Sequence, residues 1–354
     1  MTGWLLWLAL GQAQAAVEVN GVEVAVVDPH LHTLEHVGDL NVEGKAFILR
    51  QLPGFVAPYY PALVGQISDP YEPHIGIAAQ LDWAGVDQGV LLAAYTHHTV
   101  GFMTNTALAN LLQDPRNQQG DSVRFYGLAS ILLDGTPETD VMLDRLEALE
   151  SFLVDPGRHF IGIKLAHAHQ AVAMDDPWVD QVYAVAGEVG VPVLLHTGVS
   201  PFPGTRQEPE YTSPADLEAA IVRHDGSGSE GRVEFVLSHV GTGDARATEA
   251  SLDLAERYDN VWLELSALKS ALTIDSDGLP VESTTPQYEW VLEAILSRGL
   301  VDRAIFATDG PQSSGKVREY LQEIISVMQE LGYTTEQIEA VLSGNFYRCF
   351  SRAR

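Results

Sequence analysis

Two histidines, His30 and His32, end the apolar run that leads into Asp28-Pro-His-Leu-His32. On a β-strand, residues two apart point to the same side, so both imidazoles would face one way. Two neutral imidazoles so placed can bind one borderline-soft cation at about 2.1 Å each. Asp28 shares their face one step deeper, where it could accept a hydrogen bond or fill a core layer. A His-x-His pair alone is weak evidence for a metal, because incidental histidines can have the same spacing.

Polar side chains also end three apolar segments later in the chain. The segments are Val193-Leu-Leu-His196, Phe235-Val-Leu-Ser-His239 and Ile305-Phe-Ala-Thr-Asp309. Burying an imidazole or a carboxylate at such a position is unfavourable unless the group has a partner. In a parallel barrel the carboxyl ends of the strands converge on one pocket. The pattern therefore predicts that His196, His239 and Asp309 meet the first two histidines in space.

The elements needed to position these residues are eight short strands separated by amphipathic helices. The expected strands are Val22–His32, Val86–Tyr95, Arg124–Leu132, Phe160–His167, Val191–Thr197, Val233–Val240, Asn260–Ser266 and Ala304–Asp309. The expected helices include Asp140–Val154, Val179–Val189, Ala247–Tyr258, Tyr288–Arg298 and Val317–Leu331. Strict alternation of buried strand and helix implies parallel strands joined by right-handed crossovers. Eight such units predict a (β/α)8 TIM barrel of the α/β class, with long βα loops and a C-terminal helix.

The alternative fold is an open doubly wound sheet, which normally shows a glycine-rich phosphate-binding turn after its first strand. Here that strand ends in a His-x-His pair, and no Gly-x-Gly-x-x-Gly or Walker pattern occurs in the chain. A nucleotide cofactor is therefore not indicated. Long stretches follow the first, fifth and seventh expected strands, at Thr33–Pro70, Gly198–Thr212 and Ala267–Pro286. In a barrel they would lie on the face where active sites are built.

The composition limits the partners. The 354 residues carry a formal net charge of −28. A surface this acidic repels phosphate backbones and anionic lipid, so we expect no binding to nucleic acid or to a membrane surface. The single cysteine, Cys349, excludes an intrachain disulfide and a cysteine-based zinc site. The expected partner is therefore a small-molecule substrate.

The N-terminus is typical of a secretory signal peptide over residues 1–16. A short apolar core, Trp4–Leu10, precedes Ala13-Gln-Ala15, which fits a small-x-small cleavage site, but no Lys or Arg precedes the core. We expect a periplasmic or secreted protein whose residues 17–354 form one catalytic domain; without export the protein would be cytoplasmic. No internal stretch approaches the roughly 20 apolar residues of a membrane-spanning helix.

Six segments, in this order along the chain, resemble the amidohydrolase superfamily, specifically its amidohydrolase-related branch, which includes decarboxylase-type members. They are Asp28-Pro-His-Leu-His32, Gly162-Ile-Lys-Leu165, Pro192-Val-Leu-Leu-His-Thr-Gly198, Leu237-Ser-His-Val-Gly241, Ala307-Thr-Asp-Gly-Pro311 and Leu342-Ser-Gly-Asn-Phe346. The resemblance spans nearly the whole chain, and the motifs are specific together rather than singly. It implies the barrel fold, a divalent metal that is usually zinc, with Mn2+ or Fe2+ as alternatives, and a metal-bound water as the reacting species.

The resemblance also implies a role for each converging residue. His30 and His32 match the paired metal ligands, and His196 matches the third imidazole. Asp309 matches the carboxylate that binds the metal and contacts its water, and His239 would lie beside the metal as proton donor or carbonyl polariser. This chemistry is physically reasonable, because a cation lowers the pKa of bound water from about 16 toward roughly 7. A carboxylate touching that water can take its proton and return it to a leaving group.

Lys164, at the end of the fourth expected strand, leaves the number of metal ions open. In some branches of the superfamily a lysine at this place is carboxylated and bridges two metals, with His196 and His239 on the second. In the mononuclear branch, which the Gly-Ile-Lys-Leu segment also resembles, its ammonium binds an anionic substrate group or a neighbouring carboxylate. We expect one metal ion.

Further candidates for substrate contact lie in loops on the same face. Four are histidines that follow the second and fourth expected strands: His97, His98, His167 and His169. Arg206, in the loop after His196, is the best nearby cation for a substrate carboxylate, and a surface salt bridge is the alternative.

The expected activity is hydrolysis of a C–O or C–N bond, in an amide, lactone or ester, by metal-activated water. The same scaffold also serves nonoxidative decarboxylation or hydration, in which Asp309 or His239 moves the proton. A catalytically silent metal- or ligand-binding barrel is a third alternative, which is disfavoured because all five site positions are polar and competent. The fold itself gives no substrate, and a homodimer is a family expectation only.

Overall fold

Eight parallel strands form the central sheet of the protein. The structure is a computed structural model that describes residues 16–35, 46, 57–96, 99, 101–135, 138–268, 272–274, 280–282, 287–311 and 315–353, and the elements below are those of the described residues. The strands are β3 (Val27–His32), β4 (Gln88–Leu92), β9 (Phe125–Ala129), β10 (Phe160–Leu165), β11 (Val193–His196), β12 (Phe235–Ser238), β13 (Val261–Glu264) and β16 (Ala304–Ile305). Each strand pairs with the next one in this sequence order, always in parallel. This is the strand order of a barrel.

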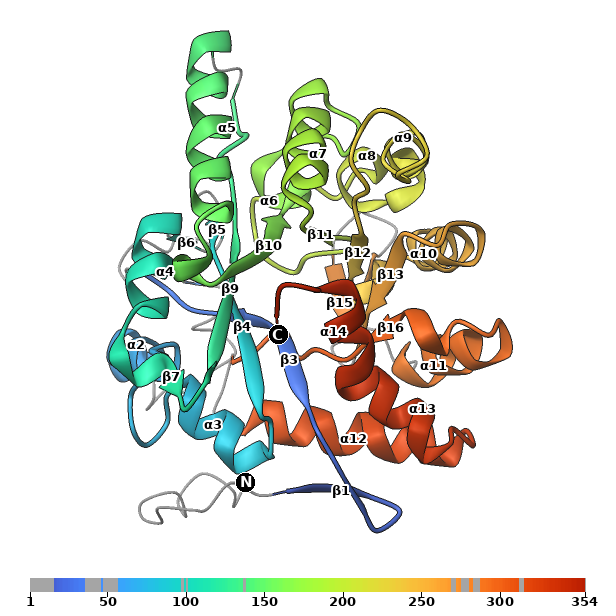
Figure 1. Cartoon of the computed structure of the whole chain (residues 1–354). Coiled ribbons are helices and arrows are strands. Elements are labelled where there is room, and N and C mark those ends of the chain that lie inside the picture. Colours follow the sequence, from blue (N-terminus) through green and yellow to red (C-terminus); the bar gives the residue numbers. More distant parts are fainter. Residues whose placement is uncertain are drawn as a thin grey trace.

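Contacts between the first strand and the segment after the last strand close the sheet. Leu31 forms a parallel bridge with Gly310. The backbone N–H of His32 donates to the Gly310 carbonyl at 2.6 Å, and the Gly310 N–H donates to the His30 carbonyl at 3.2 Å. The helices lie around the outside of the strands (Figure 1). The predicted (β/α)8 TIM barrel is therefore confirmed.

Helices lie between the strands and after the last of them. They are α2 (Tyr60–Ile67), α3 (Ile77–Ala84), α4 (Asn105–Leu112), α5 (Thr139–Leu153), α6 (His167–Gln170), α7 (Pro177–Val189), α8 (Pro209–Thr212), α9 (Glu218–Arg223), α10 (Ala245–Arg257), α11 (Gln287–Ser297), α12 (Lys316–Glu330), α13 (Thr335–Glu339) and the C-terminal α14 (Asn345–Cys349). Asp176 caps α7 through its side chain, with proline at the first helical position, and Asp244 caps α10. Such caps satisfy N–H groups that have no partner within the helix.

Short antiparallel pairs lie outside the central sheet: β1 (Val17–Val19) with β2 (Val22–Val24), β5 (Ala94–Thr96) with β6 (Gly101–Met103), β7 (Gln118–Gln119) with β8 (Ser122–Val123), and β14 (Leu272–Ile274) with β15 (Pro280–Glu282). The first pair corrects the expected strand Val22–His32, of which only Val27–His32 joins the barrel. Asn20 and Gly21 have φ angles of 52° and 79°. An Asn-Gly pair with positive φ at both residues favours a tight hairpin turn, so the chain reverses before the barrel strand begins.

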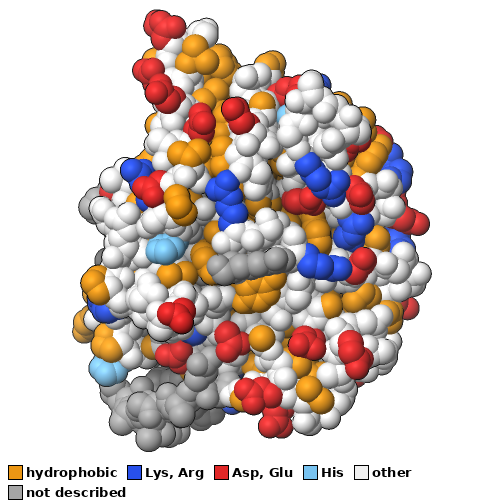
Figure 2. Space-filling view, in the orientation of Figure 1, with side chains coloured by type: hydrophobic (Ala, Val, Ile, Leu, Met, Phe, Trp, Pro, Cys, Tyr) orange, Lys and Arg blue, Asp and Glu red, His pale blue; other side chains and the backbone are white. Residues whose placement is uncertain are grey.

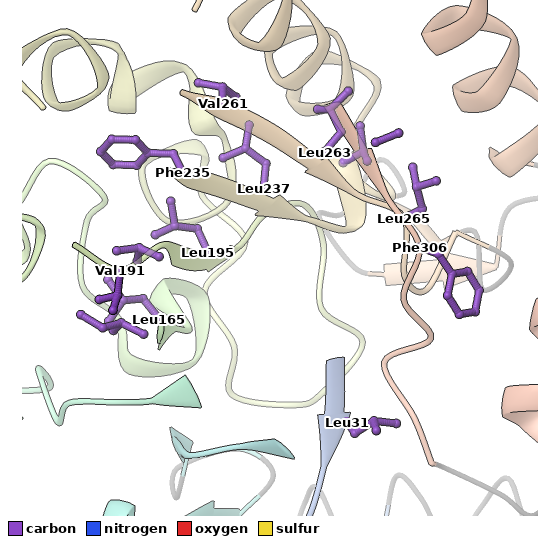
Figure 3. Close-up of a cluster of buried hydrophobic side chains, with 14 of the residues drawn as sticks. Leu31, Leu165, Val191, Leu195, Phe235, Leu237, Val261, Leu263, Leu265 and Phe306 are labelled. Atoms are coloured by element: carbon purple, nitrogen blue, oxygen red, sulfur yellow. The ribbon is translucent and has the colours of Figure 1, made fainter. Parts of the chain in front are cut away.

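Alternation along each strand separates two cores. Leu195, Leu237 and Leu263 belong to the larger cluster, which packs the sheet against the helices, and Figure 3 shows them projecting from adjacent strands. Their neighbours Leu194 and Val236 belong to the second cluster. The second cluster also contains Trp262, Ile305 and the α14 side chains Phe346, Cys349 and Phe350. Residues two apart on a strand share a face. On the inner face, the apolar Leu194, Val236 and Trp262 are therefore followed by the polar His196, Ser238 and Glu264. A polar layer thus lies above an apolar layer at the carboxyl end of the strands.

The buried face of helix α5 overlaps only in part with the one that its sequence predicts. Apolar residues at helical spacing, Val141, Leu143, Leu146, Leu149 and Phe152, predict an inward-facing set. The structure buries Leu146 and Leu149 as expected, together with Met142 and Leu153, whereas Val141 and Leu143 are 41% and 54% exposed. Figures 1 and 2 show why: α5 projects from the barrel and carries both acidic and hydrophobic side chains on its exposed surface. The buried set fits the 3.6-residue repeat over the whole helix better than the predicted set.

We expect Leu149→Ala and Leu143→Ala to have very different effects, although both remove the same atoms from the same helix. Leu149 is 1% exposed, so its truncation leaves a cavity and should lower the free energy of unfolding by about 2–5 kcal/mol. The exposed Leu143 should change that free energy by less than about 0.5 kcal/mol. Urea unfolding followed by circular dichroism measures both. Equal losses would show that the α5 packing is wrongly assigned.

Among the described residues, no helix has both the length and the hydropathy required to cross a bilayer. The expected signal peptide, residues 1–16, lies almost entirely outside the described residues, and it stays a prediction.

Candidate metal centre

Strand β3 and the segment after β16 bring three of the predicted residues together. Nε2 of His32 lies 2.9 Å from Oδ1 of Asp309, and Nε2 of His30 lies 3.3 Å from the same oxygen. The ring centroids of the two histidines are 5.1 Å apart. His30 is buried, whereas the His32 side chain is 40% exposed and faces the open side of the site.

His239 and His196, from the ends of β12 and β11, adjoin this group. The ring centroid of His239 lies 5.2 Å from that of His30 and 4.9 Å from that of His196. One ligand atom each from His30, His239 and Asp309 all lie within 4.8 Å of one another. His239, which was expected beside the metal, thus lies within the group of possible ligand atoms itself. Nε2 of His196 is buried and has no hydrogen-bond partner, as an imidazole that awaits a ligand would be.

Local backbone geometry aims two of these side chains. His239 and Asp309 have φ angles of 67° and 57°, in the left-handed region that non-glycine residues rarely adopt. Gly198, two residues after His196, has φ +83°, and a Cβ atom there would lie 2.3 Å from the Thr242 carbonyl oxygen. Strained residues of this kind each cost about 1–3 kcal/mol and concentrate at functional sites. His239 and Asp309 therefore keep unfavourable backbone conformations where the site is built, whereas Gly198 adopts its positive φ without strain.

Burial sets the protonation of the imidazoles. It lowers the pKa of His30 and of His196 well below the usual range, and neighbouring positive groups add to the effect. Burial likewise lowers the pKa of His239 to about 4. For Asp309, burial alone would raise the pKa, but the imidazoles of His30 and His32 outweigh it and hold the pKa well below its ordinary value. Near neutral pH the buried rings of His30, His196 and His239 are thus neutral and Asp309 is a carboxylate, the ligand types that suit a zinc-like cation.

The structure adds two residues that sequence reasoning missed, Glu264 and Ser266. Glu264 ends β13 and is fully buried, with Oε1 3.3 Å from Nδ1 of His30. Its Oε2 accepts the backbone N–H of His239 at 3.1 Å and the Ser266 hydroxyl at 2.9 Å. Burial raises the pKa of Glu264. The signal was present in the sequence, because Val261-Trp-Leu-Glu264 is an apolar strand with a polar end like the others.

Lys164 lies in the same polar layer, near the carboxyl end of β10. It is buried, and its Nζ donates to the Ser238 hydroxyl at 3.3 Å. Burial lowers the pKa of Lys164 to about 8, an effect that the negative charges of Glu264 and Asp309 oppose. The Lys164 ammonium therefore has neighbouring carboxylates that balance its charge, as the interpretation with a single metal ion requires.

Asp28 joins the first and last strands beneath the histidines. Its carboxylate accepts the Thr308 hydroxyl at 2.5 Å, the Thr308 N–H at 3.1 Å and the His30 N–H at 3.3 Å. Burial raises its pKa to about 7, although these hydrogen bonds oppose the shift. Asp28 thus joins the backbone of β3 to that of the segment after β16. It lies next to the site residues but is not one of the candidate metal ligands.

The remaining candidates have different positions. His169 adjoins the centre, with its ring centroid 5.3 Å from that of His196 and its Nδ1 2.6 Å from the Thr99 hydroxyl. His167 is buried, with Nδ1 3.2 Å from the Val172 carbonyl oxygen. Arg206 lies at the surface, where it pairs with Glu208 at 2.9 Å and lies over the Tyr211 ring. His97 and His98 lie outside the described residues.

Comparison with solved structures confirms the fold. An uncharacterized TIM-barrel protein from Bordetella bronchiseptica, Bb4693, matches with a TM-score of 0.62 at 17% identity, over 93% of this chain and 99% of that one. The 5-carboxyvanillate decarboxylase LigW from Sphingomonas paucimobilis matches with a TM-score of 0.55 at 14% identity, over 93% and 99%. A probable 2-pyrone-4,6-dicarboxylic acid hydrolase from Acinetobacter baumannii matches at 0.52 and 14%, over 92% and 99%.

A search of curated proteins gave no match. A model of the family described as Amidohydrolase matches residues 122–352, which is more than half of the chain and includes β10, β11, β12, β13 and β16. Together with the closed parallel barrel, this match supports an enzyme. The chain belongs to the amidohydrolase family, in the amidohydrolase-related branch that its motifs predicted.

Proposed function

We propose that this protein is a metal-dependent hydrolase that uses water to cleave a C–O or C–N bond of a small-molecule amide, lactone or ester. The observation that carries the proposal is the convergence of His30, His239 and Asp309, whose ligand atoms lie within 4.8 Å of one another although they come from three distant parts of the chain. Family membership supports the same chemistry.

The residues present fit a divalent cation. We assign His30, His32, His196 and Asp309 as its ligands, and zinc as the ion that three imidazoles and one carboxylate suit best. The unpartnered Nε2 of His196 supports this assignment, because a buried imidazole nitrogen without a hydrogen bond is otherwise unfavourable. The low pKa values of the buried imidazoles support it as well, since a neutral ring keeps a lone pair for the ion.

The side chains around the ion divide the remaining work. When bound, the cation supplies Lewis acidity, lowering the pKa of water from about 16 toward roughly 7. Asp309 carries a negative charge and is placed to accept the proton of the attacking water and to return it to the leaving group. His239 faces the same point and can exchange a proton with the substrate. Lys164 and His169 both lie near His196 and are placed to contact polar groups of the substrate.

A panel of lactones, esters and amides, assayed with zinc present and after its removal by a chelator, tests the activity. We expect hydrolysis only with the metal present, restored when zinc is added back. The same panel should include aromatic carboxylic acids with CO2 release as readout, because decarboxylation uses the same ligands. Release of CO2 without any hydrolysis would overturn the hydrolase assignment and leave the metal centre in place.

Counting metal ions per chain by mass spectrometry separates the two interpretations of Lys164. We expect a ratio near one, because the ammonium of Lys164 already has the Ser238 hydroxyl as an acceptor and lies near the charges of Glu264 and Asp309. A ratio near two, together with added mass of one carboxyl group on Lys164, would contradict the mononuclear centre. Lys164→Met is the matched control, since it should lower a ratio of two but not a ratio of one.

A further inference from the structure

Glu264 and Ser266 contact the same ring atom in two different histidines. Oε1 of Glu264 lies 3.3 Å from Nδ1 of His30, and Oγ of Ser266 lies 2.8 Å from Nδ1 of His239. The two polar groups are themselves joined by the hydrogen bond from the Ser266 hydroxyl to Oε2 of Glu264. All four residues are buried, so these contacts are shielded from bulk water. One small network therefore reaches the inner side of both rings.

Counting donors assigns a hydrogen to each of these nitrogens. An ionised carboxylate only accepts hydrogen bonds, and a hydroxyl has one hydrogen to give. The hydrogen of Ser266 is used on Glu264, so Ser266 Oγ accepts from Nδ1 of His239. By the same count, Nδ1 of His30 donates to Oε1 of Glu264. A neutral imidazole with hydrogen on Nδ1 has its lone pair on Nε2.

The opposite ring nitrogens face the proposed centre. Nε2 of His30 lies 3.3 Å from Oδ1 of Asp309, and the ligand atoms of His30, His239 and Asp309 share one neighbourhood. If both Nδ1 atoms carry hydrogen, both Nε2 atoms offer a lone pair at that point. The direction of these bonds decides whether His239 gives a proton or takes one.

We propose that Glu264 and Ser266 are a positioning pair that fixes the tautomers of His30 and His239 together, so that both rings present an unprotonated Nε2 to the metal centre. The inference rests on the proposed function. It changes the role of His239: in its resting neutral form this residue accepts a proton from the substrate or binds the ion, and it does not act as the proton donor. Glu264 and Ser266 act through the two rings and are not catalytic residues themselves.

Glu264→Gln is the most direct test, because the amide has nearly the shape of the carboxylate but adds a donor where His30 needs an acceptor. Loss of an outer hydrogen-bond partner typically lowers metal affinity about 10–100-fold. We expect a fall of that size in zinc affinity, measured by competition with a chromophoric chelator. Glu234→Gln is the matched control: Glu234 bonds Trp262 and Arg232 away from the centre, so its zinc affinity should stay within about twofold. Thermal unfolding of the metal-free chains checks that both variants fold.

Nitrogen-15 spectra of labelled histidines read the tautomers without any assay of activity. In the zinc-loaded wild type, the ring signals of His30 and His239 should show hydrogen on Nδ1. Ser266→Ala should move the signals of His239 more than those of His30, because the Ser266 hydroxyl lies 2.8 Å from Nδ1 of His239 and 3.4 Å from Nδ1 of His30. His30 keeps Oε1 of Glu264 as a partner, and His239 keeps only the Ser266 carbonyl oxygen, 3.3 Å from its Nδ1. Hydrogen on Nε2 of His239 in the wild type would overturn the positioning role.

The outcomes separate this inference from the function on which it rests. If the wild type binds zinc and Glu264→Gln binds it equally well, the positioning pair is wrong and the metal centre stands. If the wild type binds no zinc, the proposed function fails, and hydrogen on Nδ1 of both rings in the metal-free chain would still support the positioning pair. Recovery of part of the affinity in Glu264→Asp, which keeps the acceptor, would support the role of the carboxylate.

Discussion

Replacing His30 with alanine is expected to abolish metal retention and turnover together. His30 is 1% exposed, and its two ring nitrogens face Glu264 on one side and Asp309 on the other. Alanine removes one of the proposed ligands and leaves a buried gap that no neighbouring nitrogen fills. Because loss of a mere outer partner costs about 10–100-fold in affinity, loss of the ligand itself should cost at least about 100-fold. Metal content after gel filtration and kcat/KM on the same sample measure both effects.

His74→Ala is the matched control, since His74 is an exposed histidine beside Glu72, on the loop before α3. It should keep both the metal and the activity. His30→Asn, which keeps a polar group in the space, guards against a trivial loss of folding, and it should also lose the metal. A His30→Ala chain that folds, retains zinc and turns over substrate at the wild-type rate would show that the centre is assigned to the wrong residues.

The barrel and most of the candidate site could be predicted because both depend on alternation along single strands. His196 follows Leu194 by two residues, so a face that is apolar below and polar above is already visible in Val193-Leu-Leu-His196. The closing of the barrel then brings such strand ends together, which needs no knowledge of side-chain geometry. The structure places His30 and His32 beside Asp309 and the His239 ring beside that of His30.

Glu264 and Ser266 were missed because their importance depends on which atoms they reach across the barrel. Glu264 ends an apolar strand like the other site residues, but sequence alone does not distinguish a carboxylate that binds an ion from one that holds an imidazole. The distances to Nδ1 of His30 and His239 make that distinction. Similarly, the left-handed backbone at His239 and Asp309 is a property of the closed barrel. Arg206 was placed correctly in its loop, but the ion pair with Glu208 holds it at the surface.

The N-terminal hairpin and helix α5 show a second limit of sequence reasoning. The hairpin around Asn20 and Gly21 is a local signal that a search for long strands overlooks. In α5, by contrast, the expected face was right for Leu146 and Leu149 and wrong for Val141 and Leu143. Five apolar positions near the helical repeat are compatible with more than one buried face, and packing against α7 and the barrel selects one of them. Local pattern therefore sets which element forms, while tertiary contacts set which of its faces is buried.

Asp309→Asn is expected to lower kcat by about 10²–10⁴-fold while changing KM much less. The amide keeps the size of the carboxylate and one oxygen that can face the ion, but it removes the negative charge and the ability to take a proton. General acid–base catalysis contributes a factor of that size. The variant should bind zinc more weakly than the wild type, so kcat is measured at saturating zinc, with metal content determined on the same sample.

The response to added zinc distinguishes a loss of metal binding, as expected for His30→Ala, from a loss of proton transfer in Asp309→Asn. If Asp309 only held the ion, saturating zinc would restore kcat to within about threefold of the wild type, and a role in proton transfer would be contradicted. A loss that zinc does not repair, in a chain that contains its metal, is explained by the missing base. Asp302→Asn is the control for a neutralised aspartate near the start of the same strand, where the side chain is exposed, and it should leave kcat unchanged. The carboxylate in the segment after β16 would then differ from the histidines in function: the imidazoles bind the ion, and Asp309 both binds it and moves the proton.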